Sequence, residues 1–188
     1  MKQKNMKRII TVLAITLLAV TFFACKENDL EKQRENELKR LNEYMADNYS
    51  GVDPKPSGLY YFPLDEGTGD SIKIGDEVQI YYQIQRLDSS VVAQTTGYSE
   101  GHRYDPVKLV VLPPTQLSSS ATYVEELLAL HEALTYMKKG ARSRLIFDSA
   151  LGFGQYGTTG ISGFSSLIME VEVYKVIPVP VPEEEEEE

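Results

Sequence analysis

Hydrophobic and polar residues alternate along several short stretches of the chain, which is the pattern of strands with one buried face. The clearest stretch is residues 78–87, where Val78, Ile80, Tyr82 and Ile84 fall on one face. Glycine, proline and aspartate mark the turns between such stretches. Further strands are predicted at residues 59–64, 107–112, 144–148 and 167–176.

An internal segment, residues 123–137, instead repeats its hydrophobic residues at helical spacing. Lys138 and Lys139 suit the negative end of a helix dipole, and Gly140 suits a left-handed stop, so we expect the helix to end there. Strands dominate around this one helix. The pattern therefore predicts an α+β fold in which an antiparallel sheet wraps around a single helix.

Residues 28–49 predict a second helix, which lies before the strands. Asn28 can cap it, and Glu31 can complete a capping box. Its narrow hydrophobic stripe contains Leu38 and Leu41. We interpret this helix as a stalk; a dimerisation helix is the alternative, but the stripe is short for a coiled coil, so a monomer is favoured.

The N-terminus has the pattern of a secretion signal. Basic residues in positions 2–8 precede the apolar residues 9–24, a run shorter than the roughly 20 residues of a spanning helix. Cys25 follows and is the only cysteine of the chain. Its position resembles a bacterial lipobox, which implies a lipidated Cys25 and attachment to the membrane. An ordinary cleavage site with an incidental thiol is the alternative.

The residues that would follow the lipid suggest a location. Lys26 stands next to Cys25, and by resemblance to lipoprotein sorting rules this favours the outer membrane, on either its periplasmic or its surface side. We therefore expect an outer-membrane lipoprotein of the cell envelope. The predicted segments are a signal peptide (residues 1–24), a lipidated stalk and linker (25–56), a domain (57–177) and a disordered Pro/Glu-rich tail (178–188).

Charge and motifs exclude several classes of function. Removing residues 1–24 takes away four of the 19 basic side chains and none of the 28 acidic ones, which leaves a formal charge of −13 that would repel nucleic acid. His131 lies at helical spacing from Leu127 and Leu134, so a hydrogen-bonded residue at the edge of the core is expected, and neither a metal nor a cofactor is predicted. No nucleophile elbow or carboxylate pair supports hydrolysis.

The glycines of residues 152–157 spell GxGxxG. A dinucleotide site needs a helix directly after this motif, but Thr158, Thr159 and Gly160 follow here, and too little chain remains for another crossover unit. We interpret the glycines as those of a tightly turning loop.

Four stretches, taken together, resemble the FK506-binding-protein (FKBP) type of prolyl isomerase. They are the strand GDEVQIYY (75–82), the helix end EALTYMKKG (132–140), the loop GFG (152–154) and the segment GISGFSSLIMEVEV (160–173). The resemblance covers residues 57–176 and implies an FKBP-like fold with one known pocket.

The resemblance also implies which residues face that pocket. Tyr82 stands at the pocket tyrosine, and Ile161 at the loop isoleucine. Phe153 replaces the loop tyrosine and lacks its hydroxyl group. Leu127 precedes the helix as the family's Val-Ile pair does, and its backbone N–H would meet the substrate carbonyl.

Several pocket positions depart from the family pattern. Leu130 stands in place of the tryptophan of the pocket floor, and Val92 and Met169 replace phenylalanines. Ala93 replaces the aspartate, and Val107, which we interpret as a core residue, replaces a further aromatic. The resemblance therefore implies an aliphatic, wider and less shaped pocket. The alternative is that Leu130, Met169 and Val92 are also plain core residues.

Three functions are compatible with these residues. The first is a weak peptidyl-prolyl cis–trans isomerase or folding helper that acts on proline-containing peptides or unfolded exported proteins. The second is a non-catalytic module that binds a peptide or protein in the same groove. In the third, the N-terminal helix and the acidic tail mediate assembly and the domain is a spacer.

Overall fold

The computed structural model describes residues 29–179 of the 188-residue chain. The predicted signal peptide, Cys25 and the glutamate run lie outside the described residues. The chain divides into two compact units between Asn36 and Glu37. In the first unit, the described residues 29–36 are helical, and in the second, residues 37–48 are helical. Within residues 29–179, no helix has the length and hydrophobicity of a membrane span.

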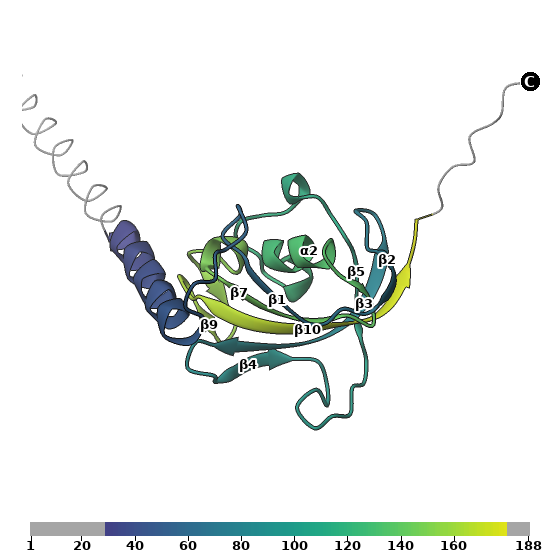
Figure 1. The fold of residues 1–188 in the computed structure, drawn as a ribbon. Helices are drawn as coiled ribbons and strands as arrows, with labels where there is room; N and C mark the ends of the chain where they lie inside the picture. Colours follow the sequence, from purple (N-terminus) through teal and green to yellow (C-terminus); the bar gives the residue numbers. More distant parts are fainter. Residues whose placement is uncertain (1–28, 180–188) are drawn as a thin grey trace, which may run out of the picture. The chain divides into compact units, whose positions relative to one another are not determined.

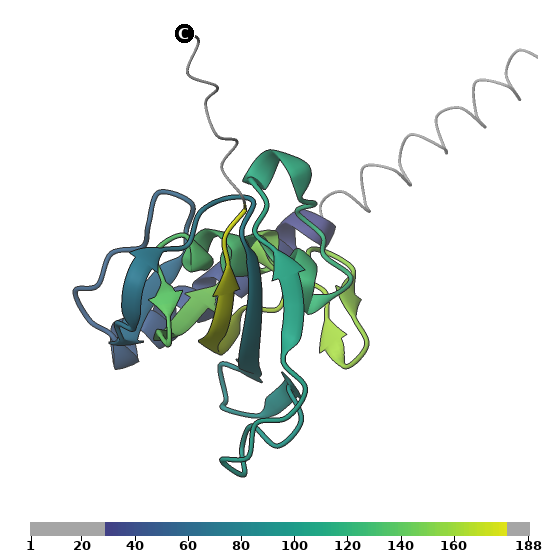
Figure 2. The same ribbon diagram turned by 90° about the vertical axis from the view of Figure 1, so that its right-hand side faces the viewer.

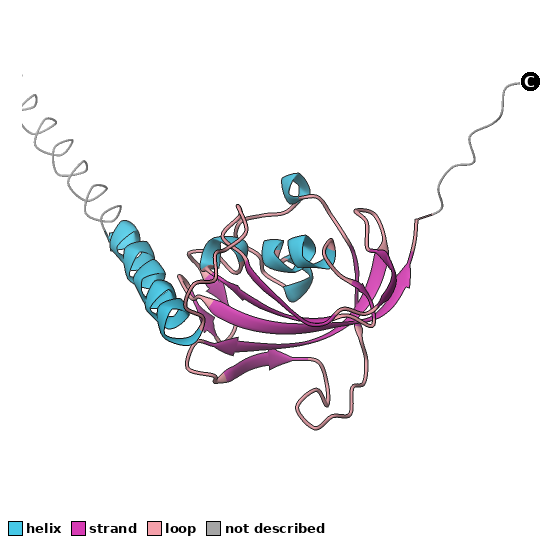
Figure 3. Cartoon of the chain, viewed as in Figure 1, coloured by secondary structure: helices cyan, strands magenta, loops and turns pink. Residues whose placement is uncertain are grey.

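A six-stranded antiparallel sheet dominates the second unit (Figures 1 and 3). Its strands follow the order β1-β7-β10-β3-β4, and β5 also pairs with β3. The strands are β1 (Tyr60–Asp65), β3 (Glu77–Arg86), β4 (Val91–Gln94), β5 (Val107–Val110), β7 (Arg142–Phe147) and β10 (Leu167–Ile177).

Two small sheets and four short helical segments also belong to this unit. β2 (Thr68–Ser71) pairs with β6 (Lys138–Lys139), and β8 (Gly157–Thr158) pairs with β9 (Ile161–Ser162). The helical segments are the α-helix α2 (Leu128–Leu134) and the 3-10 turns η1 (Pro114–Gln116), η2 (Val124–Glu126) and η3 (Ser149–Leu151).

The main core lies between α2 and the concave face of the sheet (Figures 1 and 2). Val78, Ile80 and Ile84 of β3 point into it and are fully buried, as the alternation in the sequence predicts. The opposite face of the strand carries Tyr81, which packs on Tyr174 of β10 with ring centroids 5.5 Å apart. The prediction of an α+β fold with a sheet around one internal helix is confirmed.

The internal helix is shorter than the predicted 123–137 and is interrupted near its start. Leu127 has extended backbone angles (φ −65°, ψ 121°) and separates η2 from α2. The Glu126 carboxylate accepts the backbone N–H groups of Thr122 (2.8 Å) and Tyr123 (3.2 Å), which closes a tight turn before the helix. Local side-chain hydrogen bonds of this kind compete with a continuous helix.

The prediction that residues 138–140 end this helix is wrong. α2 ends at Leu134, and Lys138 and Lys139 form β6. Gly140 does have positive φ (78°), but it turns the chain from β6 into β7. The backbone of Lys138 and Lys139 pairs with β2, so strand pairing takes the place of the expected helical turn.

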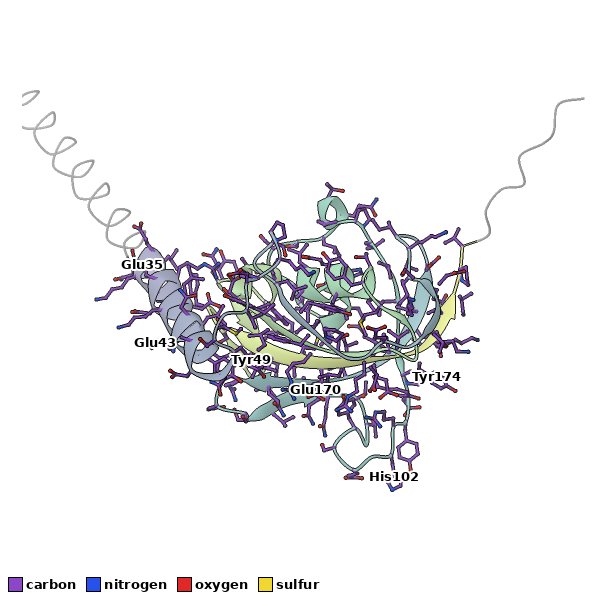
Figure 4. The ribbon with its side chains drawn as sticks, viewed as in Figure 1. Glu35, Glu43, Tyr49, His102, Glu170 and Tyr174 are labelled. Carbon is purple, nitrogen blue, oxygen red and sulfur yellow. The ribbon has the colours of Figure 1, made fainter. Side chains whose placement is uncertain are left out.

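The second half of the N-terminal helix packs on the outer face of the sheet. Leu41 and Met45 form a small cluster with Ile146 of β7 and Ile168 of β10, all buried. The Arg144 guanidinium donates to the Tyr49 hydroxyl (3.0 Å) and to Glu170 of β10 (2.6 Å), so charged groups border the cluster (Figure 4). This packing makes residues from Glu37 onward part of the same unit as the sheet.

Candidate functional site

The seven predicted site residues all belong to the main core or pack against it. They come from β3, β4, β10, the start of α2 and the glycine-rich loop, segments that are far apart in the sequence. Five belong to the main buried core, and two pack against its edge. The five are Leu127, Leu130, Phe153, Ile161 and Met169, and the two at the edge are Tyr82 and Val92.

Tyr82 is held by its backbone and keeps part of its side chain accessible. Its N–H donates to the Thr95 hydroxyl (3.2 Å), and its carbonyl accepts the Thr95 N–H (3.0 Å). Burial raises the pKa of the Tyr82 phenol, and the negative charge of Glu125 raises it further. The hydroxyl therefore stays protonated at neutral pH, so it remains a hydrogen-bond donor at the edge of the site.

Phe153 reaches the core because glycines flank it. Gly154 has φ +64°, and a Cβ on it would clash with the Ser120 hydroxyl oxygen, so the loop can approach the neighbouring segment only with glycine there. The loop is also tied to that segment by hydrogen bonds from the Ala121 N–H to the Gly152 carbonyl (3.2 Å) and from Thr158 Oγ1 to the Thr122 carbonyl (3.1 Å).

The backbone N–H of Leu127 already has a partner within the chain. It donates to the Val124 carbonyl at 3.2 Å, in the turn that precedes α2. The predicted role of this N–H, a hydrogen bond to the substrate carbonyl, remains a prediction. A substrate would have to compete with Val124 for it.

Most of the site is packed shut. Only Tyr82 and Val92 keep appreciable accessible surface. A proline ring can therefore touch the deeper side chains only if the glycine-rich loop or the neighbouring side chains move apart. The expectation of a wider pocket is wrong, because the aliphatic replacements Leu130 and Met169 are fully buried by core packing. The exposed fractions are 0% for Leu127, Leu130 and Met169, 3% for Phe153 and 4% for Ile161.

A cavity of about 290 Å³ opens at a different place, and none of the seven site residues lines it. It lies between the N-terminal helix, the β3–β4 turn and the segment that leads into β10. Its lining residues are Glu37, Arg40, Arg86, Leu87, Asp88, Ser165 and Ser166.

His131 joins the turn before α2 to the chain that follows β5. Its Nδ1 accepts the Leu112 N–H (3.0 Å), so Nε2 carries the proton and donates to the Glu125 carbonyl (2.7 Å). The ring is buried, and burial lowers its pKa. The prediction of a hydrogen-bonded histidine at the edge of the core is confirmed.

Acid is expected to weaken the fold through His131. Its pKa is lower in the folded chain than in the unfolded chain, so its stabilising effect is complete above about pH 6.5 and is lost as the pH falls through the folded value. Urea unfolding between pH 7.5 and 5 should show this decline. His131→Gln, which can still accept the Leu112 N–H but does not titrate, should flatten it; an unchanged slope in this variant would contradict the assignment.

Two buried polar residues were not foreseen from the sequence. Thr95 is buried and hydrogen-bonds to Tyr82, but nothing in the sequence distinguishes it from other threonines at strand ends. Glu37 is almost wholly buried, whereas a glutamate on an amphipathic helix is ordinarily solvated. The contacts of Thr95 and Glu37 join segments that are distant in the sequence, so the sequence alone does not reveal them.

The fold is that of an FKBP-like protein, and comparison with known families agrees. The family model described as "FKBP-type peptidyl-prolyl cis-trans isomerase" matches residues 69–174, more than half of the chain. The chain therefore belongs to the FKBP-type peptidyl-prolyl cis-trans isomerase family. The resemblance stated from the sequence is confirmed.

The individual relatives share only about a quarter of their residues with this chain. The chain is 26% identical to FkpA of Buchnera aphidicola (Schizaphis graminum) over 79% of this chain and 53% of the relative. It is 26% identical to the FKBP-type 22 kDa isomerase of Escherichia coli over 71% and 58%. The chain thus spans little more than half the length of these relatives.

Two crystal structures share the fold. FkpA from Escherichia coli superimposes with a TM-score of 0.62 at 24% identity, over 82% of this chain and 65% of that one. A Pseudomonas syringae peptidyl-prolyl isomerase gives 0.58 at 23% identity, over 77% and 96%.

Proposed function

We propose that this protein is a weak peptidyl-prolyl cis–trans isomerase or folding helper, anchored to the cell envelope through a lipidated Cys25. The observation that supports the proposal is that all seven candidate residues belong to the main core or pack against it, with Tyr82 and Val92 partly accessible. Membership of the FKBP family supports the type of reaction. The signal-like N-terminus and Lys26 support an outer-membrane location, and exported or unfolded proteins are the proposed substrates.

The chemistry requires neither a nucleophile nor a metal. Resonance keeps a peptide bond planar, and rotation about it must cross a barrier of roughly 18–20 kcal/mol. An apolar wall next to the proline ring excludes the water that stabilises the planar, polar amide, and it can contact the twisted form more closely. In this protein Phe153, Ile161 and Met169 provide the wall, and the Tyr82 hydroxyl is the polar group at its edge.

Two features of the site explain why the activity should be weak. The side chains that would touch a proline ring are almost inaccessible, so substrate binding must first displace well-packed groups. If only a small fraction of molecules has the site open, the apparent affinity is reduced by that fraction. The Leu127 N–H, moreover, is already paired with Val124.

A proline-limited refolding assay with residues 26–188 tests this proposal. The uncatalysed step takes tens of seconds, so weak catalysis is measurable. The alternative, a non-catalytic binding module, would show no acceleration but would bind proline-containing peptides in a fluorescence titration.

A chain with neither property would leave the assembly role as the remaining hypothesis. Sedimentation of residues 26–188 tests that role, because a clean monomer contradicts it.

FK506-type macrolides are expected to bind weakly or not at all. In the family these ligands stack on the tryptophan of the pocket floor, whereas Leu130 stands here and is fully buried. Calorimetry with the macrolide should give no sub-micromolar binding, while an FKBP that carries the tryptophan should bind under the same conditions. Sub-micromolar affinity for this protein would contradict the closed, aliphatic site.

A further inference from the structure

One carboxyl group of the N-terminal helix is buried against the segment that carries two of the site residues. Glu37 has only 1% of its surface exposed. Its Oε1 accepts the Ser149 backbone N–H (2.6 Å) and the Ser166 hydroxyl (3.2 Å), and its Oε2 accepts the Ser149 hydroxyl (2.7 Å). Burying a carboxyl group is costly unless hydrogen bonds compensate, and here three donors converge on it.

The two serines stand at the two ends of one segment, residues 149–166. Ser149 begins the 3-10 turn η3 that leads into the glycine-rich loop, and Ser166 directly precedes β10. Phe153 and Ile161 both lie between them. A single side chain therefore holds together both ends of the segment that forms one wall of the site.

A short relay of hydrogen bonds continues from Glu37 to Phe153. The carbonyl of Ser149 accepts the N–H groups of Gly152 (3.0 Å) and Gly154 (2.8 Å), the two neighbours of Phe153. Glu37 fixes Ser149 through its N–H and hydroxyl groups, and Ser149 fixes the backbone on both sides of the aromatic ring. On the other side, Ser166 connects Glu37 to the strand that carries Met169.

We propose that Glu37 is a positioning residue, through which the N-terminal helix holds the 149–166 segment and with it Phe153 and Ile161. The proposal deepens the proposed isomerase function and rests on it for its effect on catalysis. Glu37 keeps this wall of the site ordered once substrate has bound. Loss of its carboxyl group therefore lowers the catalytic rate, because the wall can then move away from the twisted amide.

The test is amide hydrogen exchange combined with the refolding assay, on residues 26–188. In Glu37→Ala the amides of Gly152, Gly154 and Gly157 should exchange about tenfold faster, the change expected for the loss of about one hydrogen bond. The amides of β3 and β10 should change far less. The value of kcat should fall by roughly the same factor of about ten.

Two further variants separate positioning from general stability. Glu37→Gln keeps an oxygen acceptor and gains an amide that can donate to the Ser149 hydroxyl, so it should restore most of the loop protection and the rate. Glu43→Ala removes an exposed glutamate from the same helix and should change nothing (Figure 4).

The outcomes are distinct. Faster exchange confined to the loop in Glu37→Ala, with rescue in Glu37→Gln, supports the proposal. Unchanged loop exchange, or faster exchange spread equally over the sheet, overturns it. If the wild-type chain shows no isomerase activity, the proposed function fails, but the loop exchange still decides whether Glu37 holds the segment.

Discussion

Leu130→Ala is expected to lower the free energy of unfolding by about 3 kcal/mol. Leu130 is fully buried in α2, in the cluster that also contains Met169 and Phe153. Removing a buried leucine side chain loses its transfer free energy and leaves a cavity that the neighbours only partly fill, which costs about 2–5 kcal/mol in such positions. The loss should be near the middle of this range, because the sheet restrains collapse around it on one side.

Chemical denaturation monitored by circular dichroism measures this difference, provided that the slope of the transition is the same in both proteins. Leu64→Ala is the matched control, because Leu64 lies in β1 with 43% of its surface exposed. The control should cost roughly 0.5 kcal/mol or less, as surface substitutions usually do. A loss below about 1 kcal/mol in Leu130→Ala would show that position 130 lines an open pocket, contrary to the closed site described above.

Tyr82→Ala is expected to lower kcat/KM for prolyl isomerisation at least tenfold. Tyr82 has the most accessible aromatic ring among the seven site residues, and its hydroxyl has a raised pKa and remains a donor. Losing the contact of an aromatic side chain costs about 1.5–3 kcal/mol of apolar burial, and each 1.36 kcal/mol is a factor of ten in rate.

The matched control removes a tyrosine from the other face of the same sheet. Tyr174 lies on β10 with 54% of its surface exposed, and Tyr174→Ala should leave the activity within about twofold (Figure 4). Equal losses in both variants, or a fully active Tyr82→Ala, would remove Tyr82 from the site. Circular dichroism of each variant shows whether the sheet is intact when the rates are compared.

The strands were predictable from the sequence because side chains alternate between the two faces of a strand. Val78, Ile80 and Ile84 follow this rule in β3, and their burial is as expected. The short pairing of β2 with β6 was not predictable, since β2 is exposed along its whole length and has no hydrophobic pattern. The predicted helix at residues 123–137 is too long. A turn closed by hydrogen bonds to the Glu126 carboxylate interrupts it, and the spacing of hydrophobic residues gives no sign of these bonds.

The candidate site residues could be named from the family resemblance, but their close packing could not. Each of Leu130, Val92 and Met169 could be matched to a pocket position by motif alone. Whether smaller side chains leave a wider pocket or let the walls pack together depends on how α2, the loop and the sheet approach one another. In the structure the walls pack together, and Glu37, on a helix outside the motif, holds one of them in place.

The most direct test of the central claim is the refolding rate of a proline-limited protein at increasing concentrations of the wild-type chain, residues 26–188. We expect the slow phase to accelerate in proportion to the concentration of the chain, while its final amplitude is unchanged, since a catalyst changes the rate and not the equilibrium. A slow phase that stays constant up to high concentrations of a chain that circular dichroism shows to be folded would contradict the isomerase function.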